Sequence, residues 1–253
     1  MSKGVLTGRV ALVTGSTRRI GREILLALAA AGADVIVHGR KDGEAGDAVR
    51  REAEALGVNA SVALADVSDR AEVARMIDAA VARHGRLDIL VNNAAVRRSR
   101  ALADIGPDEW REVVGIILDG AFHCSQLAAP HLARGGKGRI INIGGATAFT
   151  GARDHAHVVA AKAGLSGLTR ALAADLGPQG VTVNMVSPGL VEASGDDPVR
   201  TAERRKHYTW DRFPLGRPGS PSDIASAVAA LAGDTLAYVT GQTLHVNGGF
   251  FMT

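Results

Sequence analysis

Gly15 and Gly21 bracket a short polar stretch directly after an apolar run, a spacing that suits a tight turn around a phosphate. The apolar run Val10 to Val13 predicts a strand, and apolar residues return at helical spacing behind the turn. A helix that starts there directs its first backbone N–H groups, and the positive end of its dipole, toward a bound anion. The middle small residue of the glycine-rich nucleotide fingerprint is Arg19 here, so the match is partial. The residues predicted to surround the phosphate are Gly15, Ser16, Thr17, Arg18, Arg19, Ile20 and Gly21.

The end of the next apolar run indicates which nucleotide would bind. In a dinucleotide-binding fold, an acidic residue about twenty positions after the glycine turn binds the ribose 2′-hydroxyl, whereas a cation accommodates a 2′-phosphate. Gly39 stands where the carboxylate is expected, Arg40 follows it, and Arg18 can add a second positive charge. These residues favour NADP(H) over NAD(H), and solvated surface arginines are the alternative interpretation.

The elements that would position these residues follow from the apolar pattern. Runs of strand length alternate with longer segments of helical spacing, which predicts an α/β fold in which helices cover both faces of a seven-stranded parallel sheet. The predicted strands are Val10 to Val13, Asp34 to His38, Ala60 to Leu64, Leu87 to Val91, Arg139 to Ile143, Thr182 to Val186 and Thr243 to Val246. The predicted helices are Arg19 to Ala31, Glu44 to Leu56, Arg70 to His84, Asp108 to Leu132, His157 to Leu176 and Ser222 to Ala232.

Composition limits the class of protein. A chain of 253 residues, 46% hydrophobic and 22% charged, can bury a sizeable core, and residues 1–253 are predicted to form a single domain. The net charge of +3 balances 29 basic against 26 acidic residues, so no nucleic-acid or membrane partner is expected. Cys124, the only cysteine, stands among apolar residues and is predicted to be a buried thiol. No cluster has zinc-ligand spacing, and no run is long enough for a signal peptide or a membrane span, so we expect a cytoplasmic protein.

One segment, at about residues 190–218, has no clean period. It is polar and charged, and it carries Tyr208 and Trp210. Long segments of this kind in compact domains are usually binding loops, and this one follows the carboxyl end of the sixth predicted strand, where ligands bind in open α/β sheets. We predict a lid over the substrate, with a disordered insertion as the alternative.

Several separate motifs occur in the order and spacing of the short-chain dehydrogenase/reductase family, which the chain resembles over essentially its whole length. They are Thr14-Gly15-x-x-x-x-x-Gly21, Asp66-Val67, Asn92-Asn93-Ala94, the helix with Lys162, Asn184-x-Val186-x-Pro188-Gly189 and Gly241-Gln242-x-Leu244-x-Val246-x-Gly248-Gly249. The Thr-Gly-x-x-x-Arg-x-Gly form of the turn is similar to that of pteridine reductases, although a single turn does not identify that activity.

The resemblance implies a doubly wound Rossmann-type homo-oligomer, commonly a tetramer, with a nicotinamide cofactor across the carboxyl edge of its sheet and a small-molecule substrate. It assigns the pyrophosphate to the turn from Gly15 to Gly21 and nicotinamide ribose binding to Lys162. It also assigns adenine contacts to Asp66 and Val67, a ribose or bracing contact to Asn93, and nicotinamide contacts to Pro188, Gly189 and Val191.

The catalytic positions depart from the family pattern. Members that transfer hydride use a Tyr four residues before the Lys, a Ser thirteen residues before that Tyr, and an Asn in the preceding long helix. Counting back from Lys162, the Tyr position is Val158, the Ser position is Gly145, and the Asn position falls on or beside Ile117. A proton donor at the substrate oxygen typically contributes about 10²–10⁴-fold in rate, and valine cannot supply it.

His157 is the best replacement donor by residue type, since imidazole titrates near neutrality. Adjacent helix positions point about 100° apart, however, so His157 does not simply take the Tyr direction. The leading hypothesis is an NADP(H)-dependent oxidoreductase on a small carbonyl or alcohol substrate, with an atypical active site that uses Lys162 and His157. The alternatives are an NADP(H)-binding pseudoenzyme and a non-redox lyase or isomerase on the same scaffold.

Overall fold

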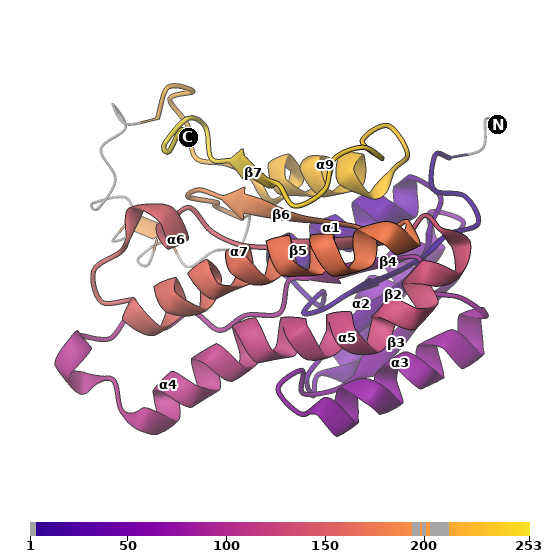
Figure 1. Ribbon diagram of the computed structural model, residues 1–253, viewed down its shortest axis with the longest axis horizontal. Helices are drawn as coiled ribbons and strands as arrows, with labels where there is room; N and C mark the ends of the chain where they lie inside the picture. The colour runs from indigo at the N-terminus through magenta and orange to yellow at the C-terminus, as the bar shows by residue number, and fades with distance from the viewer. Residues whose placement is uncertain (1–3, 194–197, 199–200, 203–212) are drawn as a thin grey trace.

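The computed structural model describes residues 4–193, 198, 201–202 and 213–253 (Figure 1). Within them lies the predicted parallel sheet of seven strands, and its strand order is β3-β2-β1-β4-β5-β6-β7. The strands are β1 Val10–Val13, β2 Asp34–Gly39, β3 Ala60–Leu64, β4 Ile89–Asn92, β5 Arg139–Ile143, β6 Thr182–Pro188 and β7 Thr243–Val246. β6 runs two residues further than predicted, to Pro188.

Helices cover both faces of the sheet (Figure 1). On one face pack α1 Arg19–Ala30, α2 Gly43–Glu54 and α9 Pro221–Ala232. On the other pack α3 Arg70–His84, α5 Gly120–Leu132 and α7 Ala156–Leu176. The shorter helical elements are η1 Leu102–Asp104, α4 Pro107–Val114, η2 Gly115–Asp119, η3 Ala133–Gly135, α6 Thr147–Thr150 and η4 Gly177–Gln179.

The alternation of side chains along each strand explains the two apolar layers. Ala11 and Val13 of β1 face α1 and α9, whereas Val10 and Leu12 face α3 and α5. All four residues of β1 are buried, because a central parallel strand has helices on both sides. This burial is why such strands read as continuous apolar runs in the sequence.

The order of strands in the sheet changes direction at β1, because β2 and β3 are added on one side of β1 and β4 is added on the other. From β1 it builds outward through β2 to the edge strand β3, and then it returns to pair β4 with the other side of β1. The loops that follow β1 and β4 therefore leave in opposite directions and open a crevice at the carboxyl edge. Ligands of open α/β sheets bind at this switch point.

The long helix predicted from Asp108 to Leu132 contains a break in its regular winding. α4 ends at Val114, and the five residues of η2 form a π-helical turn before α5 begins. A π turn inserts a residue into the α-helical repeat and changes the direction of the side chains that follow, and such turns often lie at functional sites. The periodicity of apolar residues does not reveal it, because the residues around it are apolar on both sides.

The continuous helical stretch Pro107–Gly135 is long and apolar enough to meet the length and composition criteria for a membrane span, with a mean hydropathy of 1.2. Core helices of globular proteins meet the same criteria. Cys124, Ala128 and Leu132 of α5 are buried against the sheet and α3, as in a core helix.

The segment at about residues 190–218, predicted as a lid, is described only in part. Val191 forms a parallel bridge with Gly219, and Phe213 is buried. Tyr208 and Trp210 lie outside the described residues, so the lid stays a prediction.

Candidate functional site

The side chain of a buried histidine, His38, fixes the position of the glycine turn. His38, at the end of β2, is 2% exposed, and its Nδ1 accepts a hydrogen bond of 2.9 Å from the backbone N–H of Gly15. Because Nδ1 is an acceptor, the neutral ring carries its proton on Nε2, which donates to the carbonyl of Ala65 at 3.1 Å. Burial lowers the pKa of His38 to about 4. The hydrogen bond to Ala65 and the negative charge of Asp66 raise the pKa, but their effects are smaller than that of burial. The ring is therefore neutral near pH 7 and ties the turn to the ends of β2 and β3.

Asn93 fixes the turn from the β4 side. Its side-chain Nδ2 donates to the carbonyls of Thr14 at 2.8 Å and Gly15 at 3.0 Å. The hydroxyl of Thr14 in turn accepts the backbone N–H groups of Asn93 and Ala94 at 2.9 and 3.0 Å. These bonds of Asn93 are those of a brace between two strands.

Gly21 is needed because two chain segments approach each other closely. A Cβ at this position would lie 2.3 Å from the carbonyl oxygen of Gly15 and 2.5 Å from Nδ2 of Asn93. Gly15 itself has a φ of +64°, a conformation that favours glycine. α1 starts here without a side-chain cap and without an acidic residue in its first turn. The turn therefore leaves backbone donors and a helix N-terminus open to an anion.

Arg40 lies beside a cleft of about 790 Å³ at the carboxyl ends of β2 and β3. The lining residues are Arg40, Lys41, Asp66, Ser68, Asp69, Arg70 and Glu72. Arg40 is half-exposed, with Nη1 3.9 Å from the carboxylate of Asp66. Burial raises the pKa of Asp66, but hydrogen bonds from Ser68 and the charges of Arg40 and Lys41 bring it below its usual value. The cleft is thus lined by three cations and three carboxylates, and Arg40 and Lys41 are the cations that act on Asp66.

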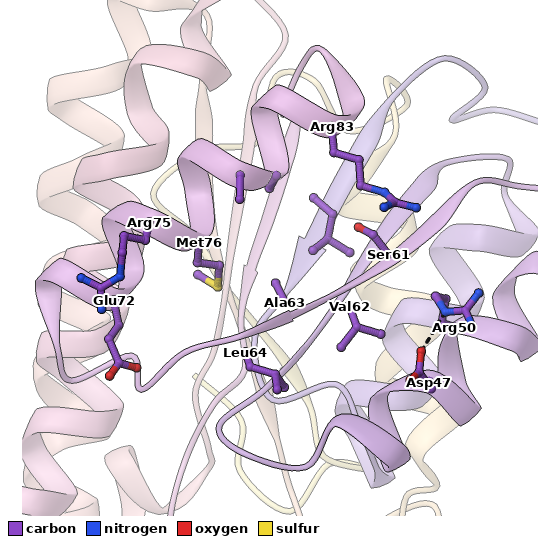
Figure 2. A pocket seen from close by; sticks show the side chains of 13 residues that line it. Asp47, Arg50, Ser61, Val62, Ala63, Leu64, Glu72, Arg75, Met76 and Arg83 are labelled. Atoms are coloured by element: carbon purple, nitrogen blue, oxygen red, sulfur yellow. Dashed lines mark hydrogen bonds and ion pairs between the residues drawn. The ribbon is translucent and has the colours of Figure 1, made fainter.

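A second hollow, of about 930 Å³, lies along β3 between α2 and α3 (Figure 2). Its Arg50 is paired with Asp47 on the same helix at 3.0 Å. Its lining does not include Arg40 or Asp66. We therefore place the candidate site at the carboxyl edge and not in this hollow.

Lys162 is a residue of α7, and its side-chain ammonium group lies almost fully buried at the end of β5. The residue is 8% exposed, and Nζ donates to the backbone carbonyl of Ile143. Burial, together with the nearby charge of Arg97, lowers the pKa of Lys162 to about 8. Arg97 stands in the loop after β4, the strand that pairs with β5.

An apolar cluster occupies the positions that the family resemblance gives to polar catalytic groups. Val158, 6% exposed, packs with Ile117 of the π turn and with Val113 and Ala161. Val96 packs against the same cluster. At Gly145, by contrast, an added Cβ would find only the Thr147 hydroxyl, at 3.8 Å. The site is therefore filled near Val158 and open near Gly145.

His157 is turned toward α4. It is fully buried, and its Nε2 lies 3.3 Å from a carboxylate oxygen of Glu109. The same carboxylate group is 3.3 Å from Arg100 on its other oxygen. This position follows from the angle between neighbouring helix residues, since Val158 and Lys162 share a face that His157 does not.

Pro188, Gly189 and Val191 lie at the carboxyl end of β6, as expected from the motif. The carbonyl of Pro188 accepts from the backbone of Ala146 at 2.8 Å, which joins this end to the loop after β5. A Cβ at Gly189 would lie 2.8 Å from the Cβ of Asn247, so the close approach needs glycine. Asp66 and Val67 follow β3 in the same way, and the carbonyl of Val67 lies 3.2 Å from Nδ1 of His123.

Sequence reasoning missed two contributors to this edge. His38 was read only as the last residue of a strand, although an ionisable side chain in an otherwise apolar run was a usable signal. Arg97 was not singled out from the arginines around it. The prediction of a buried thiol is confirmed: Cys124 is fully buried, and burial raises its pKa to about 12.

Comparisons with known proteins agree with this geometry. Residues 15–251 match the family model described as enoyl-(acyl carrier protein) reductase. The 3-oxoacyl-(acyl-carrier-protein) reductase of Staphylococcus aureus is 41% identical over 242 residues, which cover 96% of this chain and 98% of the relative. The reductase of the same name from Salmonella typhimurium is 38% identical over 245 residues, covering 97% and 98%.

Two solved structures are similar over nearly their whole length. A protein classed as a short-chain alcohol dehydrogenase from Sinorhizobium meliloti has a TM-score of 0.92 at 36% identity, covering 97% of each chain. A gluconate 5-dehydrogenase from Burkholderia cenocepacia, in complex with NADP and tartrate, has a TM-score of 0.88 at 34% identity, covering 97% of this chain and 96% of that one.

Proposed function

We propose that this chain, which belongs to the short-chain dehydrogenase/reductase family, exchanges a hydride between NADP(H) and a small carbonyl or alcohol substrate. The observation that carries the proposal is the braced glycine turn with Arg40 beside it. Support comes also from the relatives, which are named as reductases, and from the gluconate 5-dehydrogenase whose structure contains NADP.

The residues at the turn fit the pyrophosphate and adenosine half of the cofactor. The close approach of Gly21 to Gly15 and Asn93 keeps the turn tight, and the uncapped start of α1 supplies N–H donors for a phosphate. Arg40 supplies a guanidinium for the 2′-phosphate, with Arg18 as a second cation. In this arrangement Asp66 and Val67 contact the adenine, and Asn93 keeps the turn closed.

On the nicotinamide side, we assign the ring contacts to Pro188, Gly189 and Val191, and the ribose hydroxyls to Lys162. The bound cofactor supplies the hydride. The apolar cluster around Val158 shapes the neighbouring space for the less polar part of the substrate, while the open side at Gly145 leaves room for its oxygen. This atypical set of groups is part of the proposal, and His157 stays a second candidate for proton exchange.

Three further properties belong to the same proposal. We assign the chain to one domain, with a lid at about residues 190–218, and to a cytoplasmic homo-oligomer that is a tetramer by family resemblance. Exposed apolar side chains on α4 and α5, Trp110 and Phe122, offer surface for contact between copies.

The pseudoenzyme and the non-redox lyase or isomerase are the alternatives. The comparisons do not favour either, since the similar proteins are named as reductases and dehydrogenases. A pseudoenzyme would bind NADPH and reduce nothing, and a lyase or isomerase would convert a substrate without changing the nicotinamide.

The test is a fluorescence titration with NADPH and NADH, followed by a panel of carbonyl compounds. We expect tighter binding of NADPH and oxidation of NADPH with at least one carbonyl. Arg40→Ala should weaken NADPH binding by about 10- to 100-fold and leave NADH binding nearly unchanged, since a hydrogen bond to a charged group contributes about 1.5–3 kcal/mol. Arg111→Ala is the matched control, because Arg111 also pairs with an exposed carboxylate, that of Asp108. Preference for NADH, or no binding, would contradict the proposal.

A further inference from the structure

Of the positions that the family resemblance gives to proton chemistry, Lys162 alone carries a proton that can be exchanged. The others are Val158, Gly145 and Ile117. Val158 and Ile117 are 6% and 2% exposed and pack together, so aliphatic side chains occupy the position that corresponds to the tyrosine of the family.

The ammonium of Lys162 has three N–H donors, and the described residues use one of them. That donor goes to the carbonyl of Ile143 at the end of β5. The next residues along the chain are Gly144 and Gly145, and the direction of a Cβ at Gly145 is open apart from Thr147. Of the two donors that are left, the first can serve the ribose hydroxyl assigned above, which leaves the second for a substrate oxygen.

Within the described part of the chain, no carboxylate balances the charge of Lys162. On α4, Glu109 lies against Arg100 and His157, and Glu112 is paired with Arg98 at 2.7 Å. Asp119 ends the π turn, beside Gly115.

Arg97, from the loop after β4, is the charge that acts on Lys162. Burial and a neighbouring cation both disfavour the ammonium, which brings the pKa of Lys162 to about 8. A lysine with this pKa is a stronger acid than an ordinary lysine and is still mostly protonated at pH 7, which suits a proton donor near neutral pH.

We propose that Lys162 is itself the proton donor of the reduction, giving an Nζ proton directly to the substrate oxygen without an intervening tyrosine. The inference rests on the proposed function. The carbonyl carbon gains the hydride and its electron pair from NADPH, the π electrons of the C=O bond move to the oxygen, and the oxygen takes the proton from Nζ. The products are the alcohol, NADP⁺ and a neutral amine at Lys162, which regains its proton from solvent.

The first test measures the pKa of Lys162 directly. In protein labelled with ¹³C at lysine Cε, NMR signals are followed against pH, and the signal of Lys162 is identified by its absence in Lys162→Arg. We expect this lysine to titrate near pH 8. A Lys162 signal that titrates near pH 10 would overturn the proposal, whatever the enzyme reduces.

The second test separates proton donation from cofactor binding. Arginine keeps the positive charge and can still bond to Ile143 and a ribose hydroxyl, but it does not release a proton. Lys162→Arg should therefore lower kcat for reduction by about 10²–10⁴-fold and change NADPH affinity only a few-fold. The wild-type kcat/KM for reduction should fall tenfold per pH unit above about pH 8. Lys137→Arg, the same substitution at an exposed lysine paired with Asp234, should retain both values.

The outcomes distinguish the two proposals. Loss of NADPH binding by the wild type would refute the proposed function. NADPH binding and turnover with an unchanged kcat in Lys162→Arg would refute only the role of Lys162. If His157→Gln abolished the pH break while Lys162→Arg kept it, His157 would be the donor and the inference would be wrong. Binding without any turnover across the carbonyl panel would refute both.

Discussion

The neutral state of His38 should make the stability of this protein depend on pH in a defined window. The folded protein holds the imidazole with a pKa of about 4, whereas the unfolded chain has the ordinary value of about 6.5. Between these values unfolding takes up a proton, so the free energy of unfolding increases with pH. The contribution of His38 is fully present above about pH 6.5 and is lost as the pH falls toward 4. From pH 7 to pH 5 the loss is about 2 kcal/mol, and it reaches about 3 kcal/mol at pH 4.

The assay is urea unfolding at pH 5, 6 and 7 for the wild type and His38→Asn. The amide oxygen of asparagine can accept the N–H of Gly15 in place of Nδ1, and the residue does not titrate. Other groups, including His84 and His245, titrate alike in both proteins and cancel in the difference. We expect the variant to lose about 2 kcal/mol less than the wild type between pH 7 and pH 5. Parallel loss of stability in both proteins would refute the assignment of a buried, neutral His38.

A third protein tests the hydrogen bonds themselves. His38→Leu fills most of the space but leaves the N–H of Gly15 and the carbonyl of Ala65 without partners. An unsatisfied buried polar group costs about 1–3 kcal/mol, so the loss of both bonds should make the variant about 2–6 kcal/mol less stable at pH 7. Its NADPH affinity should also fall more than that of His38→Asn, because the N–H of Gly15 lies in the phosphate turn.

Two further predictions concern the turn and the apolar cluster. Gly21→Ala should weaken NADPH binding at least tenfold and destabilise the protein by about 1–3 kcal/mol, because its Cβ would lie 2.3 Å from a backbone oxygen. Gly167→Ala, in α7 with no atom within 4 Å of the added Cβ, should be neutral or slightly stabilising in the same titration and urea curves. If the missing hydroxyls limit the chemistry, Val158→Tyr combined with Gly145→Ser should raise the steady-state rate of carbonyl reduction at least tenfold. A lower rate with NADPH binding retained would indicate that the native apolar surface is itself part of the substrate site.

The sheet was predictable because its strands are buried on both sides and must be apolar throughout. Predicted and observed bounds agree for β1, β3, β5 and β7, and the glycine turn follows from two residues whose backbones must come close. The family resemblance added the order of the motifs, and with it the positions of Lys162 and Val158.

The π turn at Gly115–Asp119 could not be predicted, because a change from one helical repeat to another leaves no trace in a run that is apolar on several faces. The brace at His38 was hidden for a different reason: its partners are backbone atoms of Gly15 and Ala65, which are distant in sequence and come together only in the folded sheet. The effect of Arg97 on Lys162 likewise depends on the pairing of β4 with β5.

The two halves of the candidate site differ in what they do for the empty protein. The apolar cluster around Val158 stabilises the fold whether or not a ligand is bound, since it removes aliphatic surface from water. The glycine turn, by contrast, lowers the stability of the ligand-free protein. Gly15 and Gly21 lose more backbone entropy on folding than other residues would, and the start of α1 has no side-chain cap. A bound phosphate would accept hydrogen bonds from the backbone N–H groups at the start of α1 and offset the entropic cost of the two glycines. At phosphate concentrations above Kd, the free energy of unfolding would then increase with the logarithm of the phosphate concentration. Under the proposed function, a bound anion would account for this cost of the turn, whereas the apolar cluster alone says nothing about catalysis.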